Sequence, residues 1–276
     1  MDAMLIDEVT DLHVHGAPSL VPRHGTDQDI VEANRQVGVT LSVLKAHEGS
    51  TVERAASCDD RVVGGIVLNS IVGGANPDAV EVAARLGARI VWMPTWSSAT
   101  HLRHAAAPEL AVHRGLAFRE VPVVVEGRLL PAWHEVLDVV AAHDLVLASG
   151  HLSCVETVAL FRAAREHGIQ RLLVNHPMMS FLGWEDDLGR QLRDLGAHVE
   201  LAVLPDLLAG AQGPTSLDLL EVYPRDLMVF GGDLGHADHP TLAQALPAWL
   251  AGLVAAAGDG SAEAIMTTQG RQLLLG

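Results

Sequence analysis

Apolar and polar residues follow two alternating patterns along the chain. Short apolar runs rich in β-branched residues are each followed by a longer stretch with helical spacing. This pattern predicts repeated strand–helix units around a parallel sheet. We expect eight strands, at residues 9–15, 40–45, 62–68, 89–94, 145–149, 171–175, 197–203 and 227–231. Eight strands in alternation with helices favour a (β/α)8 TIM barrel over the alternative, a doubly wound open sheet.

The helix boundaries have local signals of their own. Asn76-Pro77-Asp78 combines a capping residue, a proline in the first turn and an acidic residue, which predicts a helix start. Ser153 and Glu156 have the spacing of a capping box, which predicts a helix that runs to His167. Further helices are expected at residues 27–36, 132–142 and 185–195, with one or two short helices before the last strand and a helical C-terminal segment.

The 276 residues are expected to form one domain, because barrels of this type commonly use about 250 residues. Residues 95–131 are the least regular part and predict an inserted loop after the fourth strand. Within this insertion, residues 118–130 have the pattern of a β-hairpin with Glu126-Gly127 at its turn.

Charge and composition narrow the class of protein. A formal net charge of −16 argues against binding to nucleic acid or to an anionic membrane surface. No apolar stretch reaches the roughly 18 residues of a membrane span, and the first residues lack the features of a signal peptide. Two cysteines, Cys58 and Cys154, do not make a disulfide framework. These features predict a cytoplasmic protein that acts on a small molecule.

Residues able to bind metal follow the expected strands at the end where barrel active sites lie. His13 and His15 end the first strand, and side chains two apart on a strand point to the same side. We therefore expect both histidines to face one ion, while Leu12 and Val14 face the surrounding helices. The other candidates after strand ends are Lys45, His47, His151, His176 and Asp233. Their combined position predicts a metal site.

Four segments carry a resemblance to a known family. They are Asp-Leu-His-Val-His at 11–15, Ser-Gly-His at 149–151, Asn-His-Pro at 175–177 and Gly-Gly-Asp at 231–233. In this order they resemble the amidohydrolase superfamily. Other short segments of the sequence resemble an uncharacterised branch of that superfamily. The resemblance implies that His13, His15 and Asp233 hold one divalent metal and that His151 and His176 hold a second. Such ligands suit Zn2+, with Mn2+ or Fe2+ as alternatives.

The single lysine of the chain departs from the pattern of that family. Members with two metals commonly bridge them with a carboxylated lysine on the fourth strand, where this sequence has Trp92-Met93-Pro94-Thr95. Lys45, on the second strand, stands against 17 arginines. It is expected to bridge the metals from an unusual direction, to stabilise an anionic substrate or oxyanion, or to form a structural salt bridge. The sequence therefore leaves open whether each chain binds one metal or two.

The resemblance implies hydrolysis of an amide, lactone or ester, with Asp233 as the general base for the attacking water. A second hypothesis is a single-metal decarboxylase similar to the aminocarboxymuconate-semialdehyde type, with His151 in proton transfer. The Lys-Ala-His segment at 45–47 is also similar to phosphoesterase barrels of the polymerase and histidinol phosphatase type. The third hypothesis is a protein that keeps the barrel fold but has no enzymatic activity.

Several other residues are candidates for the pocket. Arg23, with the lysine, suggests a carboxylate on the substrate, and Arg23, His47, Trp96 and His236 are the expected substrate-binding residues. His24 and His239 lie near them in the sequence, and Trp96, His101, Arg103 and His104 are expected in a lid. The remaining histidines, at positions 113, 134, 143, 167 and 198, are expected on the surface. The oligomeric state stays open and is compatible with a homo-oligomer.

Overall fold

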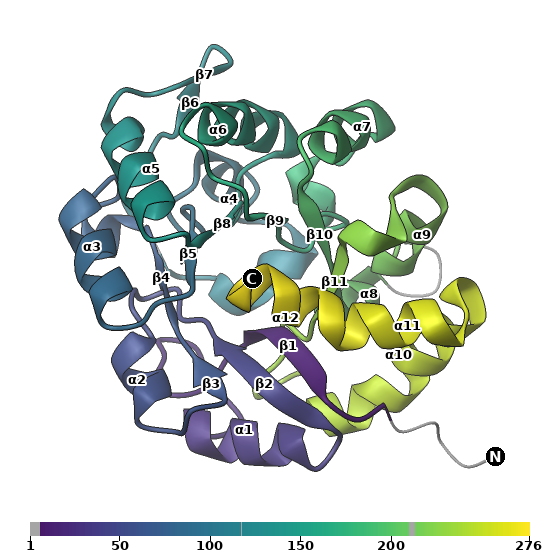
Figure 1. Cartoon of the computed structure of the whole chain (residues 1–276). Coiled ribbons are helices and arrows are strands. Elements are labelled where there is room, and N and C mark those ends of the chain that lie inside the picture. Colours follow the sequence, from purple (N-terminus) through teal and green to yellow (C-terminus); the bar gives the residue numbers. More distant parts are fainter. Residues whose placement is uncertain (1–5, 117, 210–212) are drawn as a thin grey trace.

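A computed structural model describes residues 6–116, 118–209 and 213–276 (Figure 1). All eight expected strand positions are strands in this structure and run parallel to one another. They are β1 (Val9–Val14), β2 (Val39–Leu44), β3 with β4 (Val62–Val63 and Gly65–Val67), β5 (Ile90–Trp92), β8 (Val146–Ala148), β9 (Leu172–Val174), β10 (His198–Ala202) and β11 (Met228–Gly231).

The strands form two hydrogen-bonded sheets that together make a (β/α)8 barrel, as the sequence pattern predicts. One sheet has the order β1-β2-β3 and the other β11-β10-β9-β8-β5-β4. At one seam Gly64 separates β3 from β4, and a Cβ at this position would lie 2.6 Å from the Thr51 carbonyl oxygen. At the other seam the Asp233 N–H donates to the His13 carbonyl oxygen at 2.9 Å. This second contact joins the ends of the first and last strands, where the site residues lie.

Helices surround the strands and begin where their capping residues predict. The capping box of Ser153 and Glu156 is present at the start of α6 (Cys154–Glu166), and Asn76 caps α3 (Pro77–Arg85). The other expected helices are α1 (Asp27–Arg35), α5 (Ala132–Ala142), α7 (Asp186–Asp194), α8 (Val203–Ala209) and α9 (Leu219–Val222). Outside the insertion after β5, the short helix α2 (Val52–Ala56) has no counterpart among the predicted elements. None of the described helices is long and apolar enough to span a membrane.

The C-terminal segment is helical, as expected; it begins in the outer ring beside α1, and its last helix covers the end of the barrel opposite the site. It comprises α10 (Leu242–Ala257), α11 (Asp259–Met266) and α12 (Thr268–Leu275). α12 lies across the barrel in Figure 1, and its Leu273 and Leu274 join the apolar cluster inside the strands. This cluster also includes Val43, Trp92 and Val229. Because apolar side chains fill this end, polar chemistry is confined to the other.

The prediction that Leu12 faces the helices is wrong, whereas that for Val14 is confirmed. Leu12 packs inside the barrel with Val43 and Trp92, and Val14 packs outside it with Val31. The reason is a β-bulge. Asp11 pairs with Ser42 and Val14 pairs with Leu44, so β1 has one residue more than β2 between these two pairs. An extra residue in a strand interrupts strict alternation, so the barrel interior receives both Leu12 and the His13 side chain.

The insertion after β5 forms the predicted hairpin and a covering segment. β6 (Val124–Val125) pairs antiparallel with β7 (Arg128–Leu129), and the turn at Glu126-Gly127 has positive φ at both residues, as a two-residue hairpin loop requires. Before the hairpin, the chain forms α4 (Ala99–Arg103) and a 3-10 helix, η2 (Pro108–His113). We call residues 104–116 the cover, because η2 supplies one wall of the pocket described below.

Candidate metal centre

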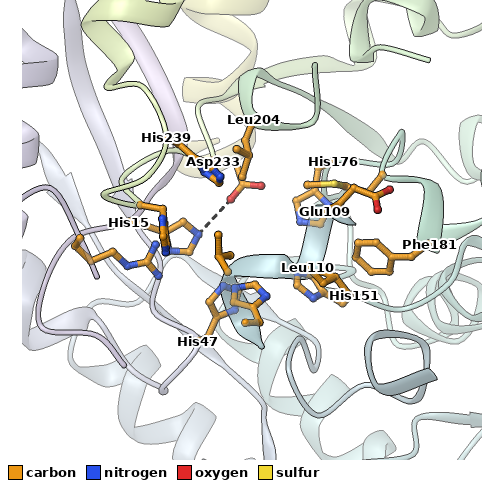
Figure 2. A pocket seen from close by; sticks show the side chains of 15 residues that line it. His15, His47, Glu109, Leu110, His151, His176, Phe181, Leu204, Asp233 and His239 are labelled. Carbon is orange, nitrogen blue, oxygen red and sulfur yellow. Dashed lines mark hydrogen bonds and ion pairs between the residues drawn. The ribbon is translucent and has the colours of Figure 1, made fainter. Parts of the chain in front are cut away.

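The carboxyl ends of β1, β9 and β11 bring three metal-binding side chains together. One ligand atom each of His13, His176 and Asp233 lies within 4.8 Å of the other two. The Nε2 of His15 is 3.2 Å from Oδ1 of Asp233 (Figure 2). The Nε2 of His13 is 3.0 Å from the same oxygen. His176 and Asp233 both have positive φ, an uncommon conformation that concentrates at functional sites.

The hydrogen bonds behind the two histidines of β1 determine which ring nitrogen faces the site. The Nδ1 of His13 lies 2.9 Å from Oε1 of Glu200, and the Nδ1 of His15 lies 2.8 Å from the Lys45 carbonyl oxygen. Both partners accept, so each Nδ1 carries the proton and donates it. The two Nε2 atoms then present lone pairs toward the Asp233 carboxylate. Acceptors this close to one another need a cation between them, and this donor set fits a divalent metal.

Burial and charge set the protonation of these groups. Burial lowers the pKa of His15 well below its ordinary value, and the positive charge of Arg23 adds to this effect. Burial alone would raise the pKa of Asp233, but its close contacts with His13 and His15 outweigh burial and hold that pKa well below its usual range. Burial also lowers the pKa of His176 to about 4. At neutral pH His15 and His176 are therefore neutral and Asp233 is ionised, which are the forms that bind metal.

The sequence analysis missed Glu200, which supports the centre from β10. Its side chain is fully buried; besides the His13 ring it accepts from the backbone N–H of His176 at 2.9 Å and from Asn175 Nδ2 at 3.2 Å. Burial would raise the pKa of Glu200, but the neighbouring His13 and its hydrogen bond lower it to about 2. Gly231 on the adjacent strand makes room, since a Cβ there would lie 2.2 Å from Oε1. A lone glutamate within the apolar run His-Val-Glu-Leu-Ala was the available signal.

Lys45 reaches the centre from β2. Its ammonium nitrogen lies 3.1 Å from the Nε2 of His13 and 5.7 Å from the centre of the Trp92 ring. The side chain is buried, and this burial lowers the pKa of the amine. Among the described residues no ion pair of Lys45 is present, so the structural salt bridge is the least supported of its three expected roles.

A second group of histidines surrounds the pocket beside the centre. The Nδ1 of His151 is 2.8 Å from the Nδ1 of His101, and the Nδ1 of His47 is 2.9 Å from the Thr95 hydroxyl. The rings of His151 and His176 are 5.2 Å apart, but only His176 belongs to the group of close ligand atoms that includes His13.

His113 was predicted on the surface, and this prediction is wrong. It ends η2 in the cover and packs edge-on against His47, with ring centres 5.2 Å apart. Burial lowers its pKa to about 3, and its Nδ1 is buried without a hydrogen-bond partner among the described residues. Helix position could not reveal this, because the direction of the cover depends on the fold of the whole insertion.

The pocket itself is narrow and is roofed by the cover. Glu109, Leu110, Val112 and His113 of the cover line it, together with side chains from the barrel loops. Its cavity volume is about 40 Å³, enough for a few water molecules. The other lining residues are His15, Arg23, His47, His151, His176, Met179, Phe181, Leu204, Asp233, His236 and His239.

The predicted substrate-binding residues lie at different depths. Arg23 and His236 are adjacent through a β-bridge between the loops after β1 and β11, and both line the pocket. His47 also lines it. Trp96 lies behind His47, with the two rings stacked 4.7 Å apart, and its side chain is fully buried. Trp96 thus supports the pocket wall, whereas the roof comes from residues that follow it in the insertion.

The barrel with a polar centre at one end is a fold that this chain shares with several enzymes of known structure. Structures with the same fold include an amidohydrolase from Pseudomonas aeruginosa, with a TM-score of 0.67, 10% identity, and 97% of this chain and 95% of that chain covered. A probable 2-pyrone-4,6-dicarboxylic acid hydrolase from Acinetobacter baumannii has a TM-score of 0.66 at 14% identity, covering 97% and 98%. The 2,6-dihydroxybenzoate decarboxylase from Rhizobium has a TM-score of 0.60 at 12% identity, covering 97% and 98%.

The likeness confirms the fold that the strand-end motifs predicted, and the similar proteins are enzymes by name. The chain belongs to a family of unknown function, DUF6282, whose pattern matches residues 8–200. The match covers β1 through part of β10 and ends before Asp233. No curated protein matches the sequence.

Proposed function

We propose that this protein is a metal-dependent hydrolase that cleaves an amide, lactone or ester bond in a small substrate bearing a carboxylate. The observation that carries the proposal is the set of lone pairs that converge on Asp233. The Nε2 atoms of His13 and His15 both lie within 3.2 Å of its Oδ1, and their other ring nitrogens are already occupied.

His13, His15, His176 and Asp233 would hold the metal, with Zn2+ favoured by the ligand types and Mn2+ or Fe2+ as alternatives. A divalent cation at this position supplies a Lewis acid and lowers the pKa of water. Asp233 accepts the proton of the attacking water and returns it to the leaving group, while Glu200 keeps the His13 ring in place. His151 and Lys45 are the residues that remain for a second metal.

The carboxylate on the substrate is proposed from Arg23, which lines the pocket near the centre. Lys45 is a second cation beside His13, suited to an oxyanion if it is not a metal ligand. Two of the similar structures are named for carboxylates, a pyrone dicarboxylic acid and a dihydroxybenzoate. The proposed substrate class agrees with those names.

A single-metal decarboxylase is the second candidate. The structure groups His176 with His13 and Asp233, which leaves only His151 of the two residues expected at a second metal. Burial lowers the pKa of His151 well below its ordinary value, so its neutral ring, hydrogen-bonded to His101, is free to relay a proton. A phosphoesterase is less favoured, because the related barrels have seven strands and this one has eight.

The experiment that separates these candidates combines metal content with product analysis. Protein purified without chelator is assayed against lactones, esters and amides that carry a carboxylate, and against aromatic carboxylates for release of CO2. Hydrolysis by the wild-type protein that is lost in the Asp233→Asn variant supports the proposal. Release of CO2 without hydrolysis supports the decarboxylase, and phosphate release from monoesters supports the phosphoesterase.

A further inference from the structure

The lining of the pocket includes a group of basic side chains and a group of apolar ones. The basic group comprises Arg23, His236 and His239, from the loops after β1 and β11. The apolar residues Leu110, Met179 and Phe181, which we call the apolar wall, also line the pocket, with Phe181 beside His151 and Glu109. Figure 2 shows His15 and His239 on one side, Phe181 on the other, and Asp233 between them.

Arg23 is a cation without a counter-ion at its end of the pocket. Among the described residues its guanidinium makes no ion pair, and its buried Nε has no hydrogen-bond partner. Of the nearby carboxylates, Asp27 forms two bonds of 2.7 Å with Arg54. Glu48 accepts from Ser19 and from the Leu20 N–H through Oε1, and among the described residues it forms no ion pair with Arg23. A planar guanidinium in this condition is suited to a carboxylate of a ligand.

The apolar wall is a cluster of its own and not an extension of the barrel core. Its three residues are buried and pack with Cys154 and Leu182. The Phe181 ring stands edge-on to the His151 ring, with centres 5.5 Å apart. Leu110 comes from the cover, so the wall is complete only when the cover is in place. Such a surface favours a compact aryl or alkyl group.

We propose that the substrate is an amphipathic carboxylate that lies across the pocket. Its anionic end pairs with Arg23, its apolar end packs on the wall, and its reacting carbonyl group lies between them beside Asp233. The inference rests on the proposed function, because it names the substrate class of the same site. It makes Arg23 and Phe181 the residues that determine specificity.

The test is binding of three probes to protein purified without chelator, measured by calorimetry. The probes are 3-phenylpropanoate, its neutral amide 3-phenylpropanamide, and acetate, which lacks the apolar end. We expect 3-phenylpropanoate to bind at least about tenfold more tightly than either of the others, since it alone uses both ends of the pocket. No preference among the three, or no binding by any of them, would overturn the inference.

Variants assign each preference to its residue. Arg23→Gln should remove the preference for the carboxylate over the amide, and Phe181→Ala should remove the preference for 3-phenylpropanoate over acetate. Glu48→Gln is the matched control, because it removes a carboxylate near Arg23 and should not weaken binding. A carboxylate preference that survives in Arg23→Gln would place the anion elsewhere, for example on the metal, and would contradict the proposal.

These outcomes are independent of turnover. If the binding preferences hold but no ester, lactone or amide is cleaved, the proposed hydrolase fails while the ligand class stands. If hydrolysis is found but Arg23→Gln and Phe181→Ala leave both preferences unchanged, the hydrolase stands and the inference about its substrate fails.

Discussion

Asp233 has two tasks at the centre, because its Oδ1 faces two imidazole nitrogens and it is the base of the proposed reaction. Asp233→Asn keeps the size of the side chain but removes the negative charge and the ability to take a proton. We expect kcat to fall by at least about 10²-fold, the usual contribution of a general base. Steady-state kinetics measures this, with circular dichroism as a control for the fold. Turnover near that of the wild type would show that Asp233 has another role.

Glu200 contacts His13 from behind, so in the proposed centre it would be a positioning residue and not a ligand. Glu200→Ala removes the acceptor that holds the Nδ1 of His13 and should weaken metal affinity by about 10–100-fold. Competition with a chelator of known affinity measures the change. Glu200→Gln retains an acceptor oxygen and should recover part of the loss. If the alanine and glutamine variants bind metal as the wild type does, the bond between Glu200 and His13 has no positioning role.

A single variant can decide which role Lys45 has. If Lys45 bridges two metals, Lys45→Ala should lower the metal content per chain. If it binds the substrate, metal content should stay the same and KM should rise. Elemental analysis and steady-state kinetics on the same preparation distinguish the two. A variant unchanged in both measurements would leave only the structural role, which no ion pair in the described part of the chain supports.

At the level of elements, the cover controls access to the pocket. A cavity of about 40 Å³ is too small for the proposed substrate, so the cover must move for one to enter. One bond that holds it closed joins Glu109 to Ser180 in the loop after β9: Oε1 of Glu109 accepts from the Ser180 N–H at 3.2 Å and from its hydroxyl. The cover otherwise rests on Leu110 and His113.

Glu109→Ala should loosen the cover. Loss of bonds worth about 1 kcal/mol raises the population of the open form about fivefold. Limited trypsin cleavage after Arg103 and Arg114, which are exposed at either end of the cover, reports that population. Glu120→Ala, an exposed glutamate of the same insertion without a hydrogen bond in the described structure, should leave the cleavage rate unchanged. Equal rates in both variants would show that the Glu109 contact does not hold the cover.

The elements also show where sequence periodicity is sufficient and where it is not. Strands and capped helices have local signals, and the structure contains each predicted strand. The bulge in β1 has no such signal, because it depends on pairing with β2, and this is why Leu12 was misplaced. His113 was misplaced for a similar reason: its burial is decided by the path of the cover over the barrel.

At the level of the whole molecule, the barrel explains why distant residues meet. Parallel strands end at one face, so side chains as far apart in sequence as His13 and Asp233 come within 3.0 Å. This topology made it predictable that these side chains converge, from their position after strands. Glu200 was harder to find, because it lies within a strand and contacts the centre from behind. The opposite end of the barrel, filled by Leu273 and Leu274 of α12, leaves one face for chemistry.

The central claim is that the converging imidazoles and Asp233 hold a metal, and metal content per chain tests it most directly. Elemental analysis of protein purified without chelator should give at least one divalent ion per chain, and His176→Ala should reduce this value. A content near one favours a single centre, and a content near two makes Lys45 a bridge. No metal in the wild type, even after addition of Zn2+ or Mn2+, would contradict the account.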